Sequence, residues 1–469
     1  MSKKDSKEKV NKKPVLWGVS AILLLISFLA VYFTMFANVN GLDWFINAKN
    51  ASDQSNTSQT QMIHQTPKPT EQNIVPEVTL KPITEETAQD PITEEMTVTK
   101  TETHTDISIA ITGDLLIHSN ILSAGYKEDS MTYDFDNIFS KVNPLFQNAD
   151  YATAFLEVPF GGKEGRNYTG FPQFNSPDEL MGGITTAGID MLLTAGTHAF
   201  DAGAGGVTRT IDTVRAKGAE VCGTGKSEAD KKYIVKDIKG IKIGFLNYSA
   251  ATSSKGRVIL NDNILTEQQE KLINTFEYGN LASFYNKISA DIQNMKNEGA
   301  EFLVLFIRWG DRYTIKPNSN QLKMAQSLCD LGIDIIVGNG THMIQPFSVI
   351  ESTDKSRTTL CMYSLGNFLS NQRKELVNYK SGHTEDGIVY KLNIRKDSKG
   401  HITCRELEYV PLWVSLGTDN GKAVYDILPK SEDTLLINGA KESYKRTEDI
   451  VDKSIKEYNN SFALDDLGD

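Results

Sequence analysis

The sequence predicts an α/β domain built on a mostly parallel sheet. Apolar strand-like runs alternate along the chain with segments of helical spacing, which is the pattern of repeated β-α-β units. In the stretch 192–203 (LLTAGTHAFDAG), an apolar run ends in a small-residue loop that carries His198 and Asp201, and a helical pattern follows at Ala204. Such loops lie at the carboxyl edge of a buried parallel sheet, where open α/β sheets place their sites.

The first half of the folded region contains four strand-like runs, two helical segments and a hairpin. Strands are predicted at 108–112, 151–158, 190–195 and 220–223, helices at 135–146 and 205–217, and a hairpin at 233–238 and 241–249 around the Lys239-Gly240 turn. We also expect a helix start at Ser176 to Glu179, with Ser176 as the cap and Pro177 at the first helical position.

The second half continues the alternation after a polar, irregular stretch at 251–278. We interpret that stretch as a loop over the site or a variable insertion. Helices are predicted at 281–297 and 321–331, strands at 302–309, 334–338, 346–351 and 360–368, and antiparallel strands at 387–395 and 402–409. A mixed-charge helical pattern at 431–458 is expected to pack on the edge of the domain or to project from it.

The amino-terminal segment predicts a membrane anchor. Val15 to Val39 contains no charged residue and as a helix spans roughly 37 Å, which exceeds the bilayer core of about 30 Å. Six lysines precede this run and the first acidic residue beyond it is Asp43, so the positive-inside rule places the amino terminus in the cytoplasm and the rest outside. A cleaved signal peptide is the alternative. The prediction is a cytoplasmic tail at 1–14 and a transmembrane signal anchor at 15–39.

Composition divides the remaining chain. Residues 40–105 are rich in Thr, Gln, Glu and Pro and are predicted to be a disordered linker, 106–425 to be the folded domain, and 426–469 to be a carboxyl-terminal helical segment. The formal net charge of −11, without a basic stripe, argues against a nucleic-acid partner. Four cysteines without a C-x-x-C pair are too sparse for a disulfide scaffold, so we expect them to fill core space.

Four side chains stand just past predicted strands. They are Asp114, Glu157, His198 and His342. Because parallel strands end at one edge of a sheet, this set of carboxylates and imidazoles is expected to converge, and it can hold one cation. His118, four residues beyond Asp114, is a reserve candidate for proton transfer.

Arg308 has two interpretations. In the first it is an edge-strand arginine that pairs with Glu157, Asp114 or Asp311. In the second it supplies a fixed positive charge in place of a metal and holds a phosphate or carboxylate in a bidentate fork. The sequence contains no G-x-S-x-G nucleophile elbow and no P-loop, so acyl-enzyme and nucleotide chemistry have no support.

With these residues laid out, the stretch 107–413 resembles the CapA family of poly-gamma-glutamate capsule synthesis proteins. The matching pieces are Gly113-Asp114, Phe155 to Glu157, Phe174 to Pro177, Thr197-His198 with Asp201 and Gly203, Arg308 to Gly310, Gly338 to Pro346, and Tyr363 to Phe368. The resemblance implies a calcineurin-like metallophosphoesterase fold, an αββα sandwich. It also implies a membrane-anchored extracellular protein that acts in synthesis or export of the capsule polymer.

The resemblance further implies the roles of single residues. Asp114, Glu157, His198 and His342 would hold a divalent metal (Mn, Zn or Mg), and His118, His198 and Arg308 would be the catalytic set of a metal-dependent hydrolase. Thr197, Arg308 and Asn339 depart from the family pattern, which has Asn, His and His there, and a guanidinium cannot ligate a metal.

The implied partners are the plasma membrane, an anionic polymer or other cell-envelope substrate, and membrane polymer-synthase subunits. The alternative is a catalytically degenerate module that holds an anionic polymer or a synthase partner through an Arg308-containing pocket.

Overall fold

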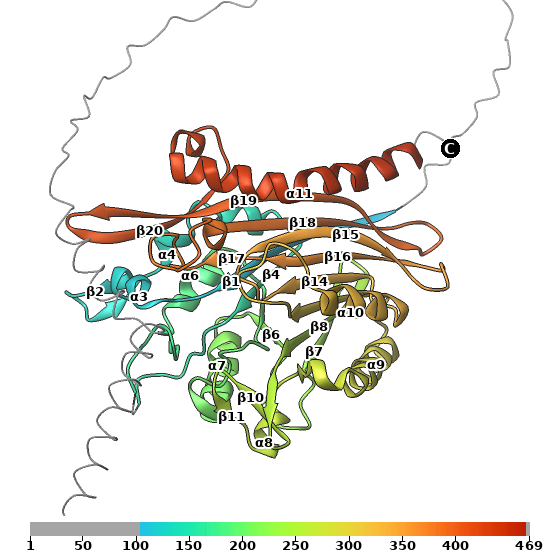
Figure 1. The fold of residues 1–469 in the computed structure, drawn as a ribbon, viewed down its shortest axis with the longest axis horizontal. Coiled ribbons are helices and arrows are strands. Elements are labelled where there is room, and N and C mark those ends of the chain that lie inside the picture. Colours follow the sequence, from blue (N-terminus) through green and yellow to red (C-terminus); the bar gives the residue numbers. More distant parts are fainter. Residues whose placement is uncertain (1–103, 165, 466–469) are drawn as a thin grey trace, which may run out of the picture. The chain divides into compact units, whose positions relative to one another are not determined.

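The computed structural model describes residues 104–164 and 166–465 (Figure 1), which belong to the compact unit Thr99–Asp469. The predicted tail, the anchor and nearly all of the linker therefore lie outside the described residues. Within the described ranges, no helix is long and apolar enough to cross a membrane.

The first large sheet has eight strands in the order β20-β19-β18-β1-β4-β5-β6, with β17 beside β1. Its strands are β1 (Thr105–Leu115), β4 (Tyr151–Leu156), β5 (Met191–Leu193), β6 (Glu220–Cys222), β17 (Asn367–Leu369), β18 (Asp386–Lys396), β19 (Ile402–Asp419) and β20 (Lys422–Pro429). β1, β4, β5 and β6 run parallel, so their carboxyl ends share one edge. β18, β19 and β20 extend the sheet as antiparallel strands.

The second large sheet has seven strands in the order β12-β8-β13-β14-β16-β15, with β7 paired to β8. Its strands are β7 (Tyr233–Ile238), β8 (Ile241–Ala250), β12 (Thr275–Phe276), β13 (Phe302–Arg308), β14 (Ile335–Asn339), β15 (Ile344–Glu351) and β16 (Thr358–Leu365). β8, β13, β14 and β16 are parallel neighbours. Every residue of β13 is buried, which explains its continuous apolar run.

The two sheets pack face to face around one apolar core. Phe155 of the first sheet meets Phe306 of the second edge-on, with ring centroids 5.9 Å apart, and Tyr151 stacks on Phe245 at 5.5 Å. These ring contacts belong to a continuous buried cluster that draws aliphatic residues from both sheets. The core therefore lies between two sheets, as in a sandwich.

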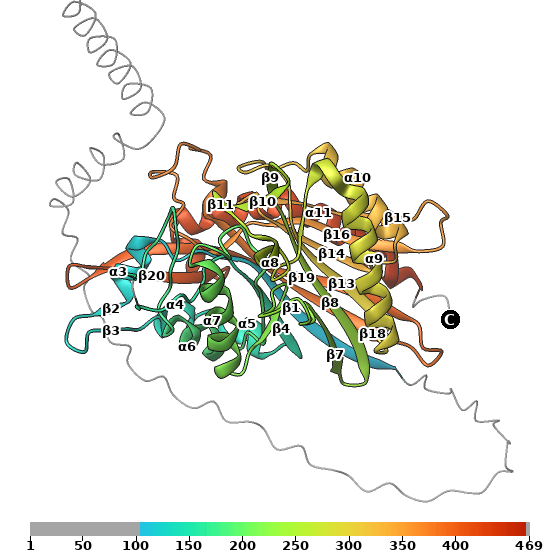
Figure 2. The same cartoon turned by 90° about the horizontal axis from the view of Figure 1, so that it is seen from below.

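Helices cover both outer faces, which completes the αββα arrangement that the resemblance implied. Those on the first sheet are α3 (Ser119–Gly125), α4 (Asp136–Phe139), α5 (Asn143–Gln147), α6 (Leu180–Thr186) and α7 (Gly203–Ala216); those on the second are α9 (Leu281–Asn297) and α10 (Ser319–Asp330). Figure 2 shows α9 and α10 lying along the second sheet. The last helix, α11 (Asn438–Asp465), lies along β19 (Figure 1) and packs on both β19 and β15, so it covers one side of the sandwich.

Smaller elements complete the chain. They are β2 (Tyr126–Lys127), β3 (Thr132–Tyr133), β9 (Thr252–Ser254), β10 (Arg257–Leu260), β11 (Asn263–Ile264), α8 (Glu267–Glu270), η1 (Tyr278–Asn280), η2 (His383–Glu385) and η3 (Thr434–Leu436). The four cysteines are buried and free, as expected of core residues.

Several local predictions differ from the structure. The helix predicted at 135–146 is two short helices, α4 and α5, and the strand predicted at 360–368 is divided between β16 of the second sheet and β17 of the first. The stretch 251–278 is not irregular, because β9, β10 and β11 form a small antiparallel sheet there. The helix expected from Ser176 begins at Leu180 instead. Its approach is held by tertiary contacts: the backbone N–H of Ser176 donates to Pro159, and Arg209 of α7 donates to both oxygens of Asp178 at 2.7 Å. The strand β20 was not predicted.

Replacing Gly113 in β1 tests the close approach of β1 to the segment after β16. A Cβ at Gly113 would lie 2.2 Å from the carbonyl oxygen of Gly366, which also accepts from the backbone N–H of Asp114 at 3.1 Å, so the backbone itself would have to shift. We expect Gly113→Ala to destabilise the fold by about 1–3 kcal/mol, measured as thermal unfolding of the purified chain. The matched control is Gly205→Ala in α7, where no atom lies within 4 Å of the added Cβ. The control should unfold at or above the wild-type temperature because alanine favours helix; equal unfolding temperatures for both variants would contradict the predicted clash.

Candidate functional site at the carboxyl edge of the two sheets

The predicted site residues meet where the two sheets end. Asp114 is the penultimate residue of β1, Glu157 follows β4 and Arg308 is the last residue of β13. His198 lies in the loop after β5, and His342 lies three residues beyond β14. All five residues are buried, with at most 5% of each exposed. The parallel registers therefore bring together side chains that lie up to 228 positions apart in the sequence.

The guanidinium of Arg308 lies between two carboxylates from the other sheet. Its Nη1 donates to Oδ1 of Asp114 at 2.5 Å, and its Nε lies 2.9 Å from Oε1 of Glu157. Asn339 also donates to Oδ1 of Asp114, at 2.8 Å. The pairing interpretation of Arg308 is thus confirmed for Asp114 and Glu157, whereas Asp311 accepts from Asn318 instead. β13 is an interior strand between β8 and β14, so the expectation of an edge strand was wrong.

Glu157 is the least well satisfied member of this cluster. Both of its carboxyl oxygens are buried, and neither accepts a hydrogen bond from a described residue, because the contact with Arg308 lacks hydrogen-bond alignment. Burial raises the pKa of Glu157, the charge of Arg308 opposes this, and Asp114 adds to the rise. The pKa of Glu157 in this cluster is therefore higher than that of an isolated glutamate.

His198 forms a dyad with Asp201. The Nδ1 atom of His198 lies 2.7 Å from Oδ2 of Asp201. The same carboxylate accepts from the backbone N–H of Phe174 and from the side-chain amide of Asn261, each at 2.7 Å. With its oxygens so engaged, Asp201 is fixed, and an Nδ1–H of His198 directed at it leaves Nε2 as a proton acceptor. Asn261 lies between β10 and β11, so the insertion at 251–278 reaches this dyad.

His118 lies at the same edge and is neutral near pH 7. Burial lowers the pKa of His118 to about 4, contact with the backbone of Leu116 opposes the shift, and the charges of His342 and His198 lower it further. Its Nδ1 accepts from the backbone N–H of Asn371 at 3.2 Å. The ring of Phe174 lies edge-on to both His118 and His198, with centroids at 5.6 and 4.7 Å, and so separates the two imidazoles.

His342 occupies a strained backbone conformation. Its φ is +59°, a region that few residues other than glycine adopt. Its Nδ1 lies 3.2 Å from Oδ1 of Asn367 and 3.3 Å from Oδ2 of Asp114. Asn367 is itself held by a donated bond to the carbonyl of Thr384 at 2.9 Å. The imidazole of His342 thus joins the Asp114–Arg308 pair to the loop before β18.

This arrangement does not fit a resident divalent cation at the two carboxylates. Residues 104–164 and 166–465 contain no group of three or more His, Cys, Asp or Glu side chains placed to hold a metal ion. Arg308 lies against one oxygen of each carboxylate, Oδ1 of Asp114 and Oε1 of Glu157, and a guanidinium offers a metal no lone pair. The Nδ1 atoms of His198 and His342 lie against Asp201 and Asn367, so only Nε2 of each ring could serve as a ligand. The metal-ligand set stays a prediction that requires Arg308 to leave.

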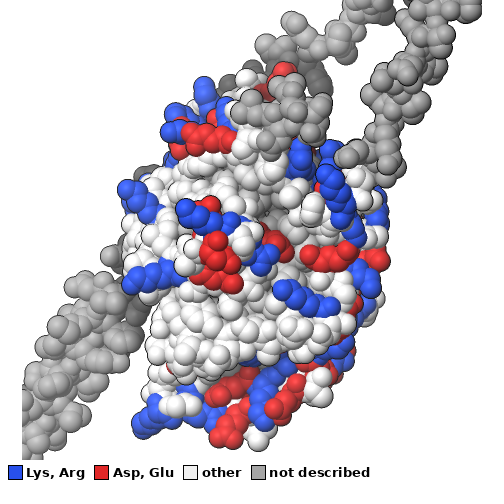
Figure 3. All heavy atoms as spheres, turned by 90° about the vertical axis from the view of Figure 1, so that its right-hand side faces the viewer, with Lys and Arg blue, Asp and Glu red and all other residues white. Residues whose placement is uncertain are grey.

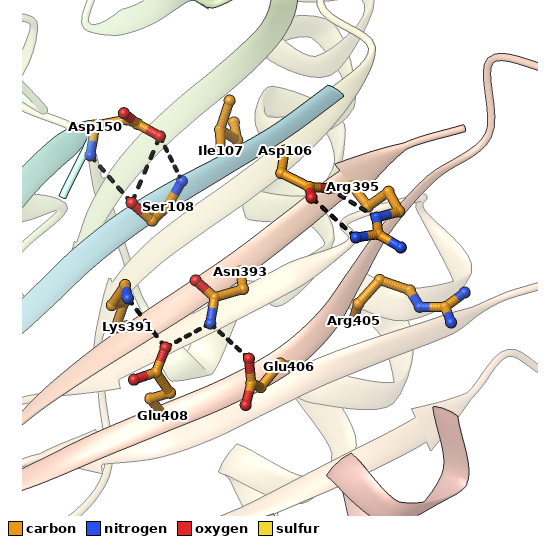
Figure 4. Close-up of a pocket in the computed structure, with 10 residues that line it drawn as sticks. All are labelled: Asp106, Ile107, Ser108, Asp150, Lys391, Asn393, Arg395, Arg405, Glu406 and Glu408. Atoms are coloured by element: carbon orange, nitrogen blue, oxygen red, sulfur yellow. Dashed lines mark hydrogen bonds and ion pairs between the residues drawn. The ribbon is translucent and has the colours of Figure 1, made fainter. Parts of the chain in front are cut away.

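A hollow of about 420 Å³ lies elsewhere, at the amino-terminal end of β1 (Figure 4), and contains none of the predicted site residues. Asp106, on its rim, lies eight positions before Asp114, or roughly 26 Å along the strand at about 3.3 Å per residue. Its charges are paired: Arg395 contacts Asp106 at 2.7 Å and Lys391 contacts Glu408 at 3.0 Å. On the face drawn in Figure 3, charges of both signs are likewise interspersed.

The sandwich and its edge cluster define an αββα protein with a histidine-, carboxylate- and arginine-containing site at the carboxyl ends of parallel strands. The model of the bacterial capsule synthesis protein PGA_cap family matches residues 108–372, more than half of the chain, and the chain belongs to this family. The matched range contains every predicted site residue.

Two curated relatives support this assignment. The chain is 24% identical over 335 residues to a capsule biosynthesis protein CapA of Bacillus anthracis, covering 69% of this chain and 67% of the relative. It is 24% identical over 310 residues to a PGA biosynthesis protein CapA of Bacillus subtilis (strain 168), covering 64% and 72%. A solved calcineurin-like phosphoesterase, YfkN from Bacillus subtilis, aligns at 14% identity and a TM-score of 0.29 over 74% of this chain and 98% of that chain. At that TM-score the alignment adds nothing to the architecture described above.

Sequence reasoning found the principal side chains but missed several of their partners. Asp201 was noted in the His198 loop without a role, although its i, i+3 spacing from His198 was a usable signal. Asn261 lies in the stretch 251–278, one interpretation of which was a loop over the site, and Asn367 lies in the matching piece Tyr363 to Phe368, but neither was assigned a contact, because only the fold brings them to this edge.

Removing the Arg308 charge tests whether the cluster holds the two sheets together. Arg308→Met leaves Asp114 and Glu157 buried without a counter-charge, so we expect a loss of about 3–5 kcal/mol in the free energy of unfolding, measured by denaturant unfolding. The triple variant that adds Asp114→Asn and Glu157→Gln should recover most of this loss. Lys445→Met, which breaks an exposed pair with Asp449 in α11, is the control and should change stability little. An Arg308→Met variant as stable as the control would contradict the assignment.

Proposed function

We propose that this protein is a membrane-anchored extracellular component of poly-gamma-glutamate capsule synthesis or export. Membership of the capsule synthesis family and the names of the two relatives support the capsule role. The uncharged run at 15–39, flanked by lysines, supports anchoring with the amino terminus in the cytoplasm. A protein so placed meets the polymer outside the cell and the membrane subunits that make it. We also infer that its sandwich is a calcineurin-like phosphoesterase fold.

The site performs proton transfer in this proposal, and the His198–Asp201 dyad is the observation that carries it. A buried carboxylate at 2.7 Å from Nδ1 orients the imidazole and stabilises its protonated form, as a general base or acid requires. Arg308 provides the fixed positive charge that the family resemblance assigns to a metal. In a hydrolytic step, His198 would take a proton from water and return it to the departing group.

A second candidate is a binding module without turnover, and Arg308 is the observation that favours it. Its ion pairs with Asp114 and Glu157 occupy two of the four predicted metal ligands. In this case the edge site holds the polymer or a synthase subunit, and the imidazoles act only as hydrogen-bonding groups.

Capsule production in cells tests the proposed function. In a strain that lacks its own copy, the full chain carrying His198→Ala should restore far less surface polymer than the wild-type chain does. We expect a reduction of about 10²-fold or more, because general acid–base groups contribute about that much. Asp201→Asn should also restore less surface polymer than the wild type. Polymer is measured on cells that contain equal amounts of the membrane-bound protein.

The control is His401→Ala, which removes an exposed histidine that pairs with Asp397 at 3.1 Å. It should restore polymer fully. Full production with His198→Ala would favour the binding module, and full production in the deletion strain would overturn the capsule role.

Metal content tests the role assigned to Arg308. The purified full chain, incubated with manganese or zinc and then desalted, should retain well under one metal ion per chain. Arg308→His frees the oxygens of Asp114 and Glu157 and adds an imidazole, so retained metal should rise toward stoichiometric. Elemental analysis measures both. Near-stoichiometric metal in the wild type that His198→Ala and His342→Ala abolish would contradict this assignment and restore the metal-dependent hydrolase.

A further inference from the structure

Two tyrosines whose rings are in contact lie outside the histidines of the edge site. Tyr313 lies in the loop after β13, and its ring centroid is 5.9 Å from that of His342. Tyr379 lies in the loop between β17 and β18, and its ring is 4.2 Å from that of Tyr313 at an angle of 31°. Tyr379 is 45% exposed, so the pair runs from His342 to solvent. We call Arg312, Tyr313, Tyr379 and Lys380 the site lip.

The position of Tyr313 is imposed by the backbone. Its φ is +67°, which disfavours a bulky side chain, and the adjoining His342 has a φ of +59°. The N–H of Tyr313 donates to the carbonyl of Thr341 at 2.8 Å, which ties the loop after β13 to the loop after β14. Two strained residues side by side at a site edge are typical of a functional constraint rather than of ordinary packing.

The lip also carries positive charge. Arg312 and Lys380 are exposed and adjoin the two tyrosines in the sequence. Within the described ranges neither forms an ion pair, so both charges can meet a ligand. The neighbouring carboxylate, Asp311, is engaged by Asn318. A chain with a formal net charge of −11 thus presents unpaired cations beside its site.

We propose that the site lip binds a linear, amide-linked polymer that carries one carboxylate per unit and holds it outside His342. This inference rests on the proposed function and names the surface that meets the polymer. The guanidinium of Arg312 takes a carboxylate in a bidentate fork, and Lys380 offers a second, mobile charge. The tyrosine faces pack against the methylene and amide groups between carboxylates. Arg308 takes no part, because it is buried and its Nη1 and Nε already contact Asp114 and Glu157.

Equilibrium binding by the full chain in detergent micelles tests the site lip. The probe is a fluorescently end-labelled gamma-linked glutamate oligomer, and binding is followed by anisotropy at low salt. Arg312→Gln should weaken binding about tenfold or more, since it removes a charge-assisted hydrogen bond. The affinity of Arg312→Lys should lie between those of the wild type and Arg312→Gln, because lysine keeps the charge but cannot form the bidentate contact. Tyr379→Leu should weaken binding several-fold. A gamma-linked glutamine oligomer of equal length should not bind.

The matched control is Lys445→Gln, which removes one exposed charge on α11 and should leave affinity unchanged. Affinities are compared only among variants that unfold at the same temperature as the wild type. Arg312 and Tyr379 are exposed, so their replacement should leave the fold intact. His401→Ala, which removes an exposed histidine outside the site, should also bind like the wild type. Unchanged affinity in Arg312→Gln and Tyr379→Leu would overturn the site lip while leaving the capsule role intact.

Two further outcomes test the ligand class, the binding surface and the capsule role separately. Equal affinity for dextran sulfate, lost in the same variants, would overturn the carboxylate polymer as the ligand class. If the wild-type chain does not bind the oligomer, the site lip is overturned. The proposed function fails as well only if cells that lack the protein still produce capsule.

Discussion

The contact on which the site depends is the placement of Arg308 between Asp114 and Glu157. Asp114 and Glu157 belong to the first sheet and Arg308 to the second, so the charges join the sheets where their parallel strands end. Burying charged groups is unfavourable unless each finds a partner, and two carboxylates at this depth require a cation. The arginine meets this requirement within the chain itself. The edge loops are then organised around a charge centre that the fold provides.

An internal cation gives the cluster properties that a metal would not. A guanidinium stays protonated at every physiological pH, so its charge does not depend on metal supply. One positive charge beside two carboxylates leaves an excess negative charge, and burial, together with the charge of Asp114, raises the pKa of Glu157 although Arg308 opposes the rise. A proton on Glu157 leaves Arg308 and Asp114 as a balanced pair. Because a raised carboxyl pKa favours the folded state at low pH, this contribution is lost as pH rises through the folded-state pKa of Glu157.

The sequence was most informative where one local pattern decides the structure. The central strands and α9 lie close to where apolar runs and helical spacing place them, because those segments are buried in a single environment. The site side chains could be predicted because strand ends are visible in the sequence. The start of α6 could not, because a tertiary contact between Asp178 and Arg209 overrides the local capping signal. β20 and the sheet at 251–278 depend on pairing with β19 and on contacts with the His198 loop, which periodicity does not record.

The site residues differ in how far they are exposed, and this limits what each of them can contact. Asp114 and Glu157 are at most 1% exposed, so no polymer can contact them, and they act only through Arg308, Asn339 and His342. His198 and His342 are 5% exposed, which suffices for a proton or a small group but not for a chain. In the proposed function, the polymer is therefore recognised by side chains farther out, and Tyr379 is the exposed end of the aromatic pair that leads to His342. The proposed recognition at the lip and the proposed proton transfer beneath it are consequently separable, although the strained loops after β13 and β14 connect them.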